Sequence, residues 1–250
     1  MKALITGASS GIGEAIAKYL ASLDFELILV GRDKAKLEKM QASLDVSSKV
    51  IIADLSDITK VKEVYVLTKN ENIDVLINNA GFGLFGNFYE TDLNKELEMI
   101  HTNVEAVHLL TKLFLRDMKS KDNGYIMNVA SLAAFGPGPL MATYYATKAY
   151  VNTLTESINE ELRRDKSKVF VCSLCPGPVD TNFNNVAGVS FSVKPLTSDY
   201  VAKYAIDSMF KGKVVIIPGF MMRISMFFRR FASRSFIRKF TYNIQKKKQQ

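Results

Sequence analysis

The chain has 250 residues, 48% of them hydrophobic, which is enough to bury a large core within a single α/β domain. The formal net charge of +8 is unevenly placed, because residues 219–250 hold nine Lys or Arg and no acidic residue, whereas residues 1–218 hold 24 basic and 25 acidic side chains. This nearly neutral body argues against a basic groove for nucleic acid, and no window of about 18 residues is apolar and uncharged enough to predict a membrane span.

Short apolar segments alternate with amphipathic ones along the chain. Seven strands are expected in the segments KALIT (2–6), ELILVG (26–31), KVIIAD (49–54), IDVLINN (73–79), GYIMNVAS (124–131), KVFVCSLCP (168–176) and KVVIIPG (213–219). Their continuous apolarity is typical of parallel strands covered on both faces. With helical patterns between them, the sequence predicts a doubly wound α/β fold with right-handed crossovers. We expect one domain over residues 1–218, followed by a basic amphipathic extension over residues 219–250.

The first expected strand runs into the glycine-rich segment TGASSGIG, residues 6–13, which opens a helix. Gly7, Gly11 and Gly13 allow tight turns and close approach of a ligand to the backbone. The free N–H groups and the positive dipole end of the following helix suit a diphosphate. Glycines alone also fit a turn that only permits helix–strand packing, but a position at the carboxyl edge of a parallel sheet favours ligand binding.

Three motifs together carry a family resemblance. TGASSGIG, NNAG at 78–81 and YYATK at 144–148 stand in the order and at the distances of the classical short-chain dehydrogenase/reductase family. The chain resembles this family from residue 2 to about residue 218. The resemblance implies a Rossmann-type sheet of about seven strands, a nicotinamide cofactor, and oxidation or reduction of an alcohol/carbonyl pair.

Two neighbouring tyrosines compete for the role of acid/base. The family's YxxxK motif fits Tyr144 and Lys148, because Tyr145 is only three residues from the lysine. On a helix, residues four apart share one face, whereas Tyr145 is turned away by roughly 100°. A free phenol has a pKa of about 10, and we expect the ammonium of Lys148 to lower that of Tyr144. For Tyr145, packing or hydrogen bonding at a helix interface is the favoured interpretation.

Two further residues match the family's catalytic set. Ser131, thirteen residues before Tyr144, closes the fifth expected strand, and the resemblance implies that its hydroxyl binds the substrate oxygen. Asn103, in IHTNVEA, corresponds to the family's asparagine that holds a water linked to Lys148. Alone, these residues are an ordinary turn serine and an ordinary helical asparagine. No residue cluster has metal-ligand spacing, so no metal is expected.

The resemblance also implies which residues contact the cofactor. In chain order they are Gly7, Ser9, Ser10, Gly11, Ile12, Gly13, Arg32, Asp54, Leu55, Asn79, Ala80, Gly81, Tyr144, Lys148, Pro176, Gly177, Val179 and Thr181. Asp54 and Leu55 border the adenine, and the last four receive the nicotinamide carboxamide.

The end of the second expected strand bears on the choice between NADP and NAD. An acid there takes the ribose 2′-hydroxyl of NAD, whereas an Arg accommodates the 2′-phosphate of NADP. Arg32 follows Gly31 directly, so we expect NADP, and we interpret Asp33 as the N-cap of the next helix. The family's second basic residue is absent, since Ser10 occupies its position.

The loops expected around the substrate are rich in large apolar side chains, namely Phe82, Leu84, Phe85, Phe135, Met141, Phe183 and Phe191. They favour a small hydrophobic carbonyl or alcohol substrate, but packing against each other or against a second subunit explains them equally well. The hypotheses are therefore an NADP-dependent oxidoreductase, a catalytically silent nucleotide-binding module, and a protein that works through its tail. We expect a homodimer or homotetramer.

The cysteines and the first residues indicate the compartment. Cys172 and Cys175 are too few for a disulfide framework and, three apart on a strand, point to opposite faces as buried thiols. Residues 1–10 enter a strand at once, so no signal peptide is expected. We expect a cytoplasmic protein.

The basic extension leaves two interpretations open. Phe220, Ile224, Phe227, Phe228 and Phe231 fall on one helical face, and Phe236, Ile237, Phe240 and Ile244 resume the pattern. With cations off that face and no acids, the extension suits peripheral contact with an anionic membrane. The other interpretation is that the apolar face packs on the body or on a second subunit.

Overall fold

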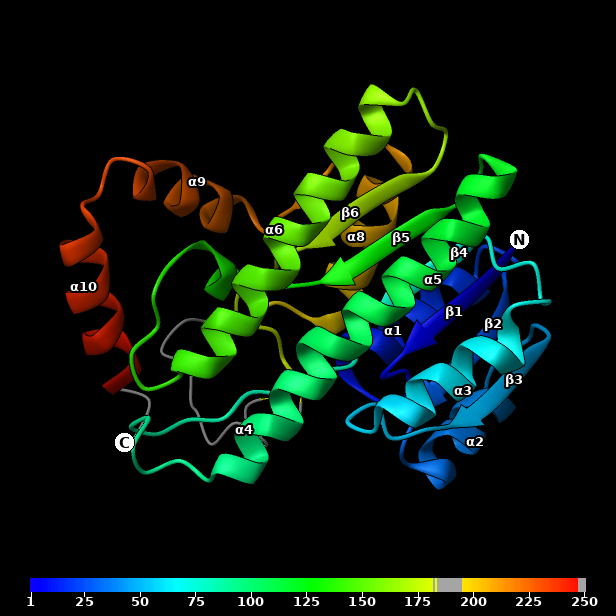
Figure 1. Ribbon diagram of the computed structural model, residues 1–250, viewed down its shortest axis with the longest axis horizontal. Coiled ribbons are helices and arrows are strands. Elements are labelled where there is room, and N and C mark those ends of the chain that lie inside the picture. Colours follow the sequence, from blue (N-terminus) through cyan, green and yellow to red (C-terminus); the bar gives the residue numbers. More distant parts are fainter. Residues whose placement is uncertain (182, 184–194, 247–250) are drawn as a thin grey trace.

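A computed structural model describes residues 1–181, 183 and 195–246 as one layered α/β body with a helical arm (Figure 1). Phe191 therefore lies outside the described residues. Seven parallel strands form one sheet in the order β3-β2-β1-β4-β5-β6-β7. The strands are β1 (Lys2–Thr6), β2 (Glu26–Gly31), β3 (Ser48–Ile52), β4 (Val75–Asn78), β5 (Tyr125–Val129), β6 (Phe170–Leu174) and β7 (Val215–Ile216). The predicted doubly wound sheet is confirmed.

The strand order reverses between β1 and β4. The chain first builds outward through β2 and β3, then crosses back so that β4 pairs with the free side of β1, with Ile5 opposite Ile77. Ligands of open α/β sheets bind beyond the carboxyl ends of the strands at such a reversal. The glycine-rich segment follows β1 and the NNAG segment ends β4, so the topology brings these two motifs together.

Helices cover both faces of the sheet. One face carries α1 (Gly11–Ala21), α2 (Lys34–Ala42) and α8 (Ser198–Phe210), and the other carries α3 (Ile58–Thr68), α5 (Ala106–Lys121) and α6 (Ala142–Arg164). Strand residues alternate between these two cores, as with Ile5 on the α1 side and Leu4 on the α5 side. Both faces are buried, which explains the continuous apolarity of the strand sequences.

Shorter elements shape the carboxyl edge of the sheet. The helix α4 (Leu93–Ile100) continues through a π-helical turn, η1 (His101–Glu105), into α5, and the 3-10 helix η2 (Leu132–Phe135) follows β5. Beyond β7 come α9 (Phe220–Arg229) and α10 (Arg234–Lys246), which lie to one side of the layers (Figure 1). The division into residues 1–218 and 219–250 stays a prediction. Within the described part of the chain, no helix is long and apolar enough to cross a membrane.

Some strands are shorter than their apolar sequences suggest. The fourth was expected over 73–79, but β4 covers only Val75–Asn78, because the backbone N–H of Asn79 donates to the Thr6 hydroxyl and the Ile77 carbonyl instead of continuing the ladder. The two cysteines are free and buried, in cores on opposite sides of the sheet, as predicted. Burial raises the pKa of the Cys175 thiol to about 12, so it stays protonated.

Thr6 joins the ends of β1 and β4. Its hydroxyl accepts hydrogen bonds from the backbone N–H groups of Asn79 and Ala80, each at 3.0 Å, and donates to the carbonyl of Ile77 at 3.4 Å. The side chain is fully buried. One hydroxyl thus fixes the position of the NNAG segment relative to the glycine-rich segment.

We expect Thr6→Val to lower the free energy of unfolding by about 1–3 kcal/mol, because the isosteric side chain leaves the partly buried Ala80 N–H without its acceptor. Asn79 keeps a second acceptor in the Ile77 carbonyl, which limits the loss. Urea unfolding would measure it, with Thr153→Val on the exposed side of α6 as the matched control, expected within about 0.5 kcal/mol of the parent. Equal stability of both variants would contradict this role.

Candidate active site

Tyr144 and Lys148 lie one turn apart on α6 and are both buried. The Lys148 Nζ donates to the carbonyl of Val129, the last residue of β5, at 2.8 Å and lies 5.9 Å from the centroid of the Tyr144 ring. Tyr145 points elsewhere, because its hydroxyl accepts a hydrogen bond from Gln245 of α10 at 2.8 Å. The structure therefore pairs Lys148 with Tyr144 and places Tyr145 at a helix interface, as the spacing predicts.

Ser131 lies at the carboxyl end of β5 and caps η2. Its hydroxyl accepts a hydrogen bond from the backbone N–H of Ala133 at 3.1 Å, and its extended backbone turns the chain out of the sheet. The Ser131 side chain also acts as a hydrogen-bonding group toward the Tyr144 phenol, which lowers the pKa of that phenol. The two hydroxyls and the Lys148 ammonium thus converge from β5 and α6.

Burial dominates the ionisation of this group. Loss of solvent raises the pKa of Tyr144 to about 12, and the hydrogen bond with Ser131 opposes this only in part. The expectation that Lys148 lowers the pKa of Tyr144 is not met in this structure, because the ammonium lies over the ring and donates to Val129. Burial also lowers the pKa of Lys148 to about 8. At pH 7 the phenol therefore holds its proton, and the lysine is mostly cationic.

Asn103 is fully buried within the π-helical turn η1. Its amide donates to the carbonyl of Phe82 at 2.9 Å and accepts from the N–H of Phe82 at 3.1 Å, and it also donates to the Thr147 hydroxyl at 3.2 Å. A side chain on Gly81 would lie 2.8 Å from the Asn103 amide oxygen and 3.3 Å from Lys148 Nζ. Only a glycine at position 81 lets Asn103 and Lys148 come this close to the backbone there.

The glycine-rich segment makes a tight turn before α1. Gly7 and Gly11 have φ of 64° and 57°, which side-chain-bearing residues rarely adopt, and a Cβ on Gly13 would clash with the Gly7 carbonyl. Ser10, the N-cap of α1, makes no side-chain hydrogen bond to the first turn of the helix. The N–H groups of that turn also have no partner within the helix. Such an uncapped helix start fits a diphosphate.

The other residues expected in this segment differ in exposure. Ser9 faces Gly31 at the end of β2, at 3.6 Å from a Cβ built there. Ile12 packs partly against the core on the α1 side, so it offers its backbone rather than its side chain to a ligand. Asn79 and Ala80 are held beside Gly7 through Thr6, a residue that the sequence did not single out.

Arg32 and Asp54 lie together at the carboxyl ends of β2 and β3. Their side chains are 3.6 Å apart and largely exposed. Burial raises the pKa of Asp54, but hydrogen bonds from Ser56 and the charge of Arg32 outweigh it and hold the pKa below its ordinary value. Asp33 accepts a hydrogen bond from the Lys36 N–H at 3.1 Å, which confirms it as the N-cap of α2. Leu55 is buried in the core, so only its backbone can face a ligand.

The turn after β6 lies between three parts of the site. The Pro176 carbonyl accepts a hydrogen bond from the Leu132 N–H at 3.0 Å, and Thr181 lies 3.0 Å from a Cβ built on Gly11. Val179 is buried and forms a β-bridge with Leu196. Gly177 lies against Met222 of α9. The turn thus contacts η2, the glycine-rich segment and the C-terminal arm.

Most of the apolar loop residues gather around Tyr144. Phe82, Leu84, Phe85, Met141 and Phe183 belong to one cluster with it, and the rings of Tyr144 and Phe183 are 5.4 Å apart. Phe135 is not part of this cluster and packs with Val107 and Val151 instead. Among the residues that the structure describes, the side chain of Tyr144 therefore has a largely apolar surround, with the polar groups of Ser131 and Lys148 nearby.

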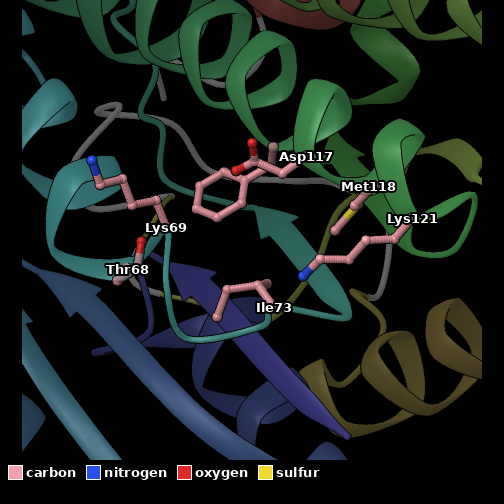
Figure 2. A pocket seen from close by; sticks show the side chains of 7 residues that line it. Thr68, Lys69, Ile73, Asp117, Met118 and Lys121 are labelled. Carbon is pink, nitrogen blue, oxygen red and sulfur yellow. The ribbon is translucent and has the colours of Figure 1, made fainter.

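A hollow on the far side of the molecule is too small to bind a substrate. It lies between α3 and α5, with a volume of about 10 Å³, and Figure 2 shows Lys69, Asp117 and Lys121 around it. Such a space holds one water at most. Asp117 and Lys121 are paired there with Tyr65 and Asn72. This hollow is excluded as the functional site.

Comparison with known proteins agrees with this geometry. Residues 1–188 match the family described as short chain dehydrogenase. An uncharacterised oxidoreductase of Staphylococcus epidermidis is 34% identical over 181 residues, which cover 72% of this chain and 78% of that protein. The residues that match the family, 1–188, include the glycine-rich segment, Ser131, Tyr144 and Lys148.

Two solved structures share the fold over most of their length. A short-chain dehydrogenase from Sphingobium yanoikuyae in complex with NADPH has a TM-score of 0.81 and 28% identity, covering 88% of each chain. A short chain dehydrogenase/reductase from Burkholderia phymatum in complex with NAD has a TM-score of 0.79 and 26% identity, covering 86% of this chain and 88% of the other. The two neighbours bind different nicotinamide cofactors.

The buried ammonium predicts a pH-dependent stability. Because burial lowers the pKa of Lys148 from 10.5 to about 8, the unfolded chain holds more protons than the folded one between these values. We therefore expect the free energy of unfolding to rise from pH 8 to pH 10.5 relative to Lys148→Met, which has no group to titrate. Urea unfolding of both proteins across this range measures the difference. Parallel curves would mean that Lys148 titrates normally.

Proposed function

The chain belongs to the short-chain dehydrogenase family, and from this premise we propose that it is an NADP(H)-dependent oxidoreductase that interconverts a hydrophobic carbonyl compound and an alcohol. The observation that carries the proposal is the convergence of Tyr144, Lys148 and Ser131 in one buried site at the carboxyl edge of the sheet. A screen of NADPH oxidation with ketones, aldehydes and 3-oxoacyl compounds tests it directly.

The residues at the sheet reversal fit a dinucleotide. The uncapped start of α1 suits a diphosphate, Asp54 lies where adenine would be bordered, and the Pro176–Thr181 turn adjoins the glycine-rich segment. When bound, the nicotinamide supplies the hydride. Lys148 would hold the nicotinamide ribose, and the segment from Asn79 to Gly81 would lie beside the adenosine half of the cofactor.

In the proposed reduction, Tyr144 gives the proton from its hydroxyl to the substrate oxygen and is left as phenolate. Because its pKa lies well above neutrality, the phenol carries this proton at neutral pH. The Lys148 ammonium donates to Val129 and lies 5.9 Å from the centroid of the Tyr144 ring, so it would stabilise the phenolate only from a position nearer the phenol oxygen. The Ser131 hydroxyl donates to the substrate oxygen as charge develops there, and Asn103 fixes the backbone at Gly81 and Phe82.

NADP is favoured by Arg32. Its guanidinium is 65% exposed beside the end of β2, and its pairing with Asp54 at 3.6 Å is weak enough to be exchanged for a phosphate. An acid that takes a ribose 2′-hydroxyl would stand at the end of β2. Asp54 follows β3 and accepts hydrogen bonds from Ser56, so it is not that acid. The NADPH complex of the Sphingobium neighbour supports this choice, although the Burkholderia neighbour binds NAD.

A homo-oligomer is part of the same proposal. An apolar hollow of about 400 Å³ lies on the outer surface of α4, η1 and α6, where Phe88, Ile100 and Tyr150 line it. An apolar surface of this kind suits a second copy of the chain. Sedimentation velocity would measure the assembly.

The two tyrosines give a matched pair of variants. We expect Tyr144→Phe to lower kcat by at least about 100-fold while NADPH still binds, because only the proton donor is removed. Tyr145→Phe should keep most of the activity, since its hydroxyl contacts Gln245. Steady-state kinetics and NADPH titration measure both effects. An inactive Tyr145→Phe beside an active Tyr144→Phe would reverse the assignment, and a parent inactive on every carbonyl would favour a silent nucleotide-binding module.

Cofactor choice has its own test. We expect Arg32→Ala to weaken NADPH binding by about 1.5–3 kcal/mol, the contribution of a charge-assisted hydrogen bond, and to leave NADH binding nearly unchanged. Lys34→Ala, which removes a neighbouring exposed cation from α2, is the control and should change neither. Equal losses for NADPH and NADH in Arg32→Ala would remove the basis for NADP.

A further inference from the structure

The C-terminal arm exposes a row of large apolar side chains. In α9, Phe220, Phe227 and Phe228 are 67%, 53% and 65% exposed, and Phe231 just beyond it is 77% exposed. At 100° per residue these side chains fall within one third of the helix circumference. In α10, Phe236, Phe240 and Ile244 form a second exposed row. We call these two rows the apolar stripe.

The opposite side of the arm contacts the body. Met222 lies against Gly177 in the turn after β6, and the Arg229 guanidinium covers Gly136 in the loop after η2. Gln245 is buried and donates to the Tyr145 hydroxyl, and Thr241 one turn earlier is buried too. The interpretation in which the apolar face packs on the body is therefore wrong for the described residues, because polar side chains and a methionine occupy that contact.

Cations surround the apolar stripe. The exposed basic residues of the described arm are Arg223, Arg230, Arg234, Arg238, Lys239 and Lys246. Residues 219–250 contain no acidic residue to neutralise them. Arg223 donates to the hydroxyl of Tyr204 on α8 at 2.9 Å, so the start of the arm is also fixed to the body on its basic side.

The charge distinguishes between the two occupants that an apolar surface can have. In a two-fold symmetric dimer the same patch meets itself, which brings together two sets of cations from arms that hold no acidic residue. An anionic bilayer instead offers an apolar interior beneath a layer of negative phosphates, which matches both features. Over the described residues of the arm, neither helix is long enough to span a bilayer, because α9 has 10 residues and α10 has 13.

We propose that the arm binds the surface of an anionic lipid bilayer, with the apolar stripe inserted at the headgroup boundary and the surrounding Arg and Lys side chains on the lipid phosphates. The contacts at Gly136, Tyr145 and Gly177 place the membrane on the side of the body where Tyr144 lies. A hydrophobic substrate would then reach the site from the lipid. Only this last consequence rests on the proposed function.

The test is flotation of the full chain with vesicles, which requires no substrate and no activity. We expect binding to vesicles of phosphatidylglycerol and phosphatidylcholine in equal parts at an ionic strength of about 0.01 M, and little binding to pure phosphatidylcholine. Raising the salt to about 1 M, where the Debye length falls to about 3 Å, should release most of the protein. Absence of binding to the anionic vesicles at low salt would overturn the proposal.

Two variants separate the apolar and electrostatic contributions. Replacing Phe227, Phe228 and Phe231 by Ser should weaken binding by roughly a hundredfold or more, because three inserted rings are lost. Replacing Arg230, Arg238 and Lys239 by Gln should weaken it by about fivefold for each cation. The matched control carries Val66→Ser and Leu67→Ser. These two side chains are similarly exposed but lie on α3, away from the arm, so this variant should bind like the parent (Figure 1).

Measurements of thermal stability and of oligomeric state complete the test. The phenylalanine variant should unfold at the same temperature as the parent, since the stripe is not buried. A clear loss of thermal stability would mean that the stripe packs on the body. A parent that assembles through the stripe and ignores vesicles would mean that a second copy covers it. Either result would overturn the proposal, and so would a phenylalanine variant that binds vesicles as the parent does.

Discussion

The position of one buried cation sets the geometry of the site. Lys148 is 5% exposed, and its ammonium donates to the carbonyl of Val129 at the end of β5. A charge removed from water is costly unless polar groups surround it, so this contact fixes the register of α6 against the sheet. Tyr144 lies one turn earlier on the same helix, and Ser131 lies two residues beyond Val129. The register of α6 therefore sets the positions of both hydroxyls.

The neighbours of Lys148 are arranged to permit its burial. Gly81 has no side chain, and this lets both the Asn103 amide and the Lys148 ammonium lie close to its backbone. Asn103 occupies a π-helical turn, a wider form of helix that is frequent at functional sites. Its amide binds both polar groups of the Phe82 backbone, so the NNAG segment and the helix after it are held as one unit. The NNAG segment is therefore held in place by the protein's own hydrogen bonds.

Local patterns predicted the fold and the pairing of residues, but not their energetics. Apolar runs identified all seven strands, and the four-residue spacing selected Tyr144, because both signals depend only on nearby residues. The role of Thr6, the early end of β4 and the π-helical turn depend on contacts between distant segments, and no spacing in the sequence encodes them. The sign of the Tyr144 pKa shift failed for the same reason. The number of charged neighbours is readable from the motif, but burial by Phe183 and Met141 is not.

The C-terminal arm shows the limit of amphipathic periodicity most clearly. The sequence locates an apolar face on each helix, but periodicity does not say whether that face meets the body or the surroundings. In α1 the apolar residues Ile16 and Leu20 are buried in the core, whereas in α9 and α10 the aromatic residues point outward and Met222, Thr241 and Gln245 point inward. Helices this short are marginal in isolation, so the inward contacts must hold them in place. An exposed aromatic row kept in a fixed position is a liability for a protein in water, and it becomes useful where a lipid surface can cover it.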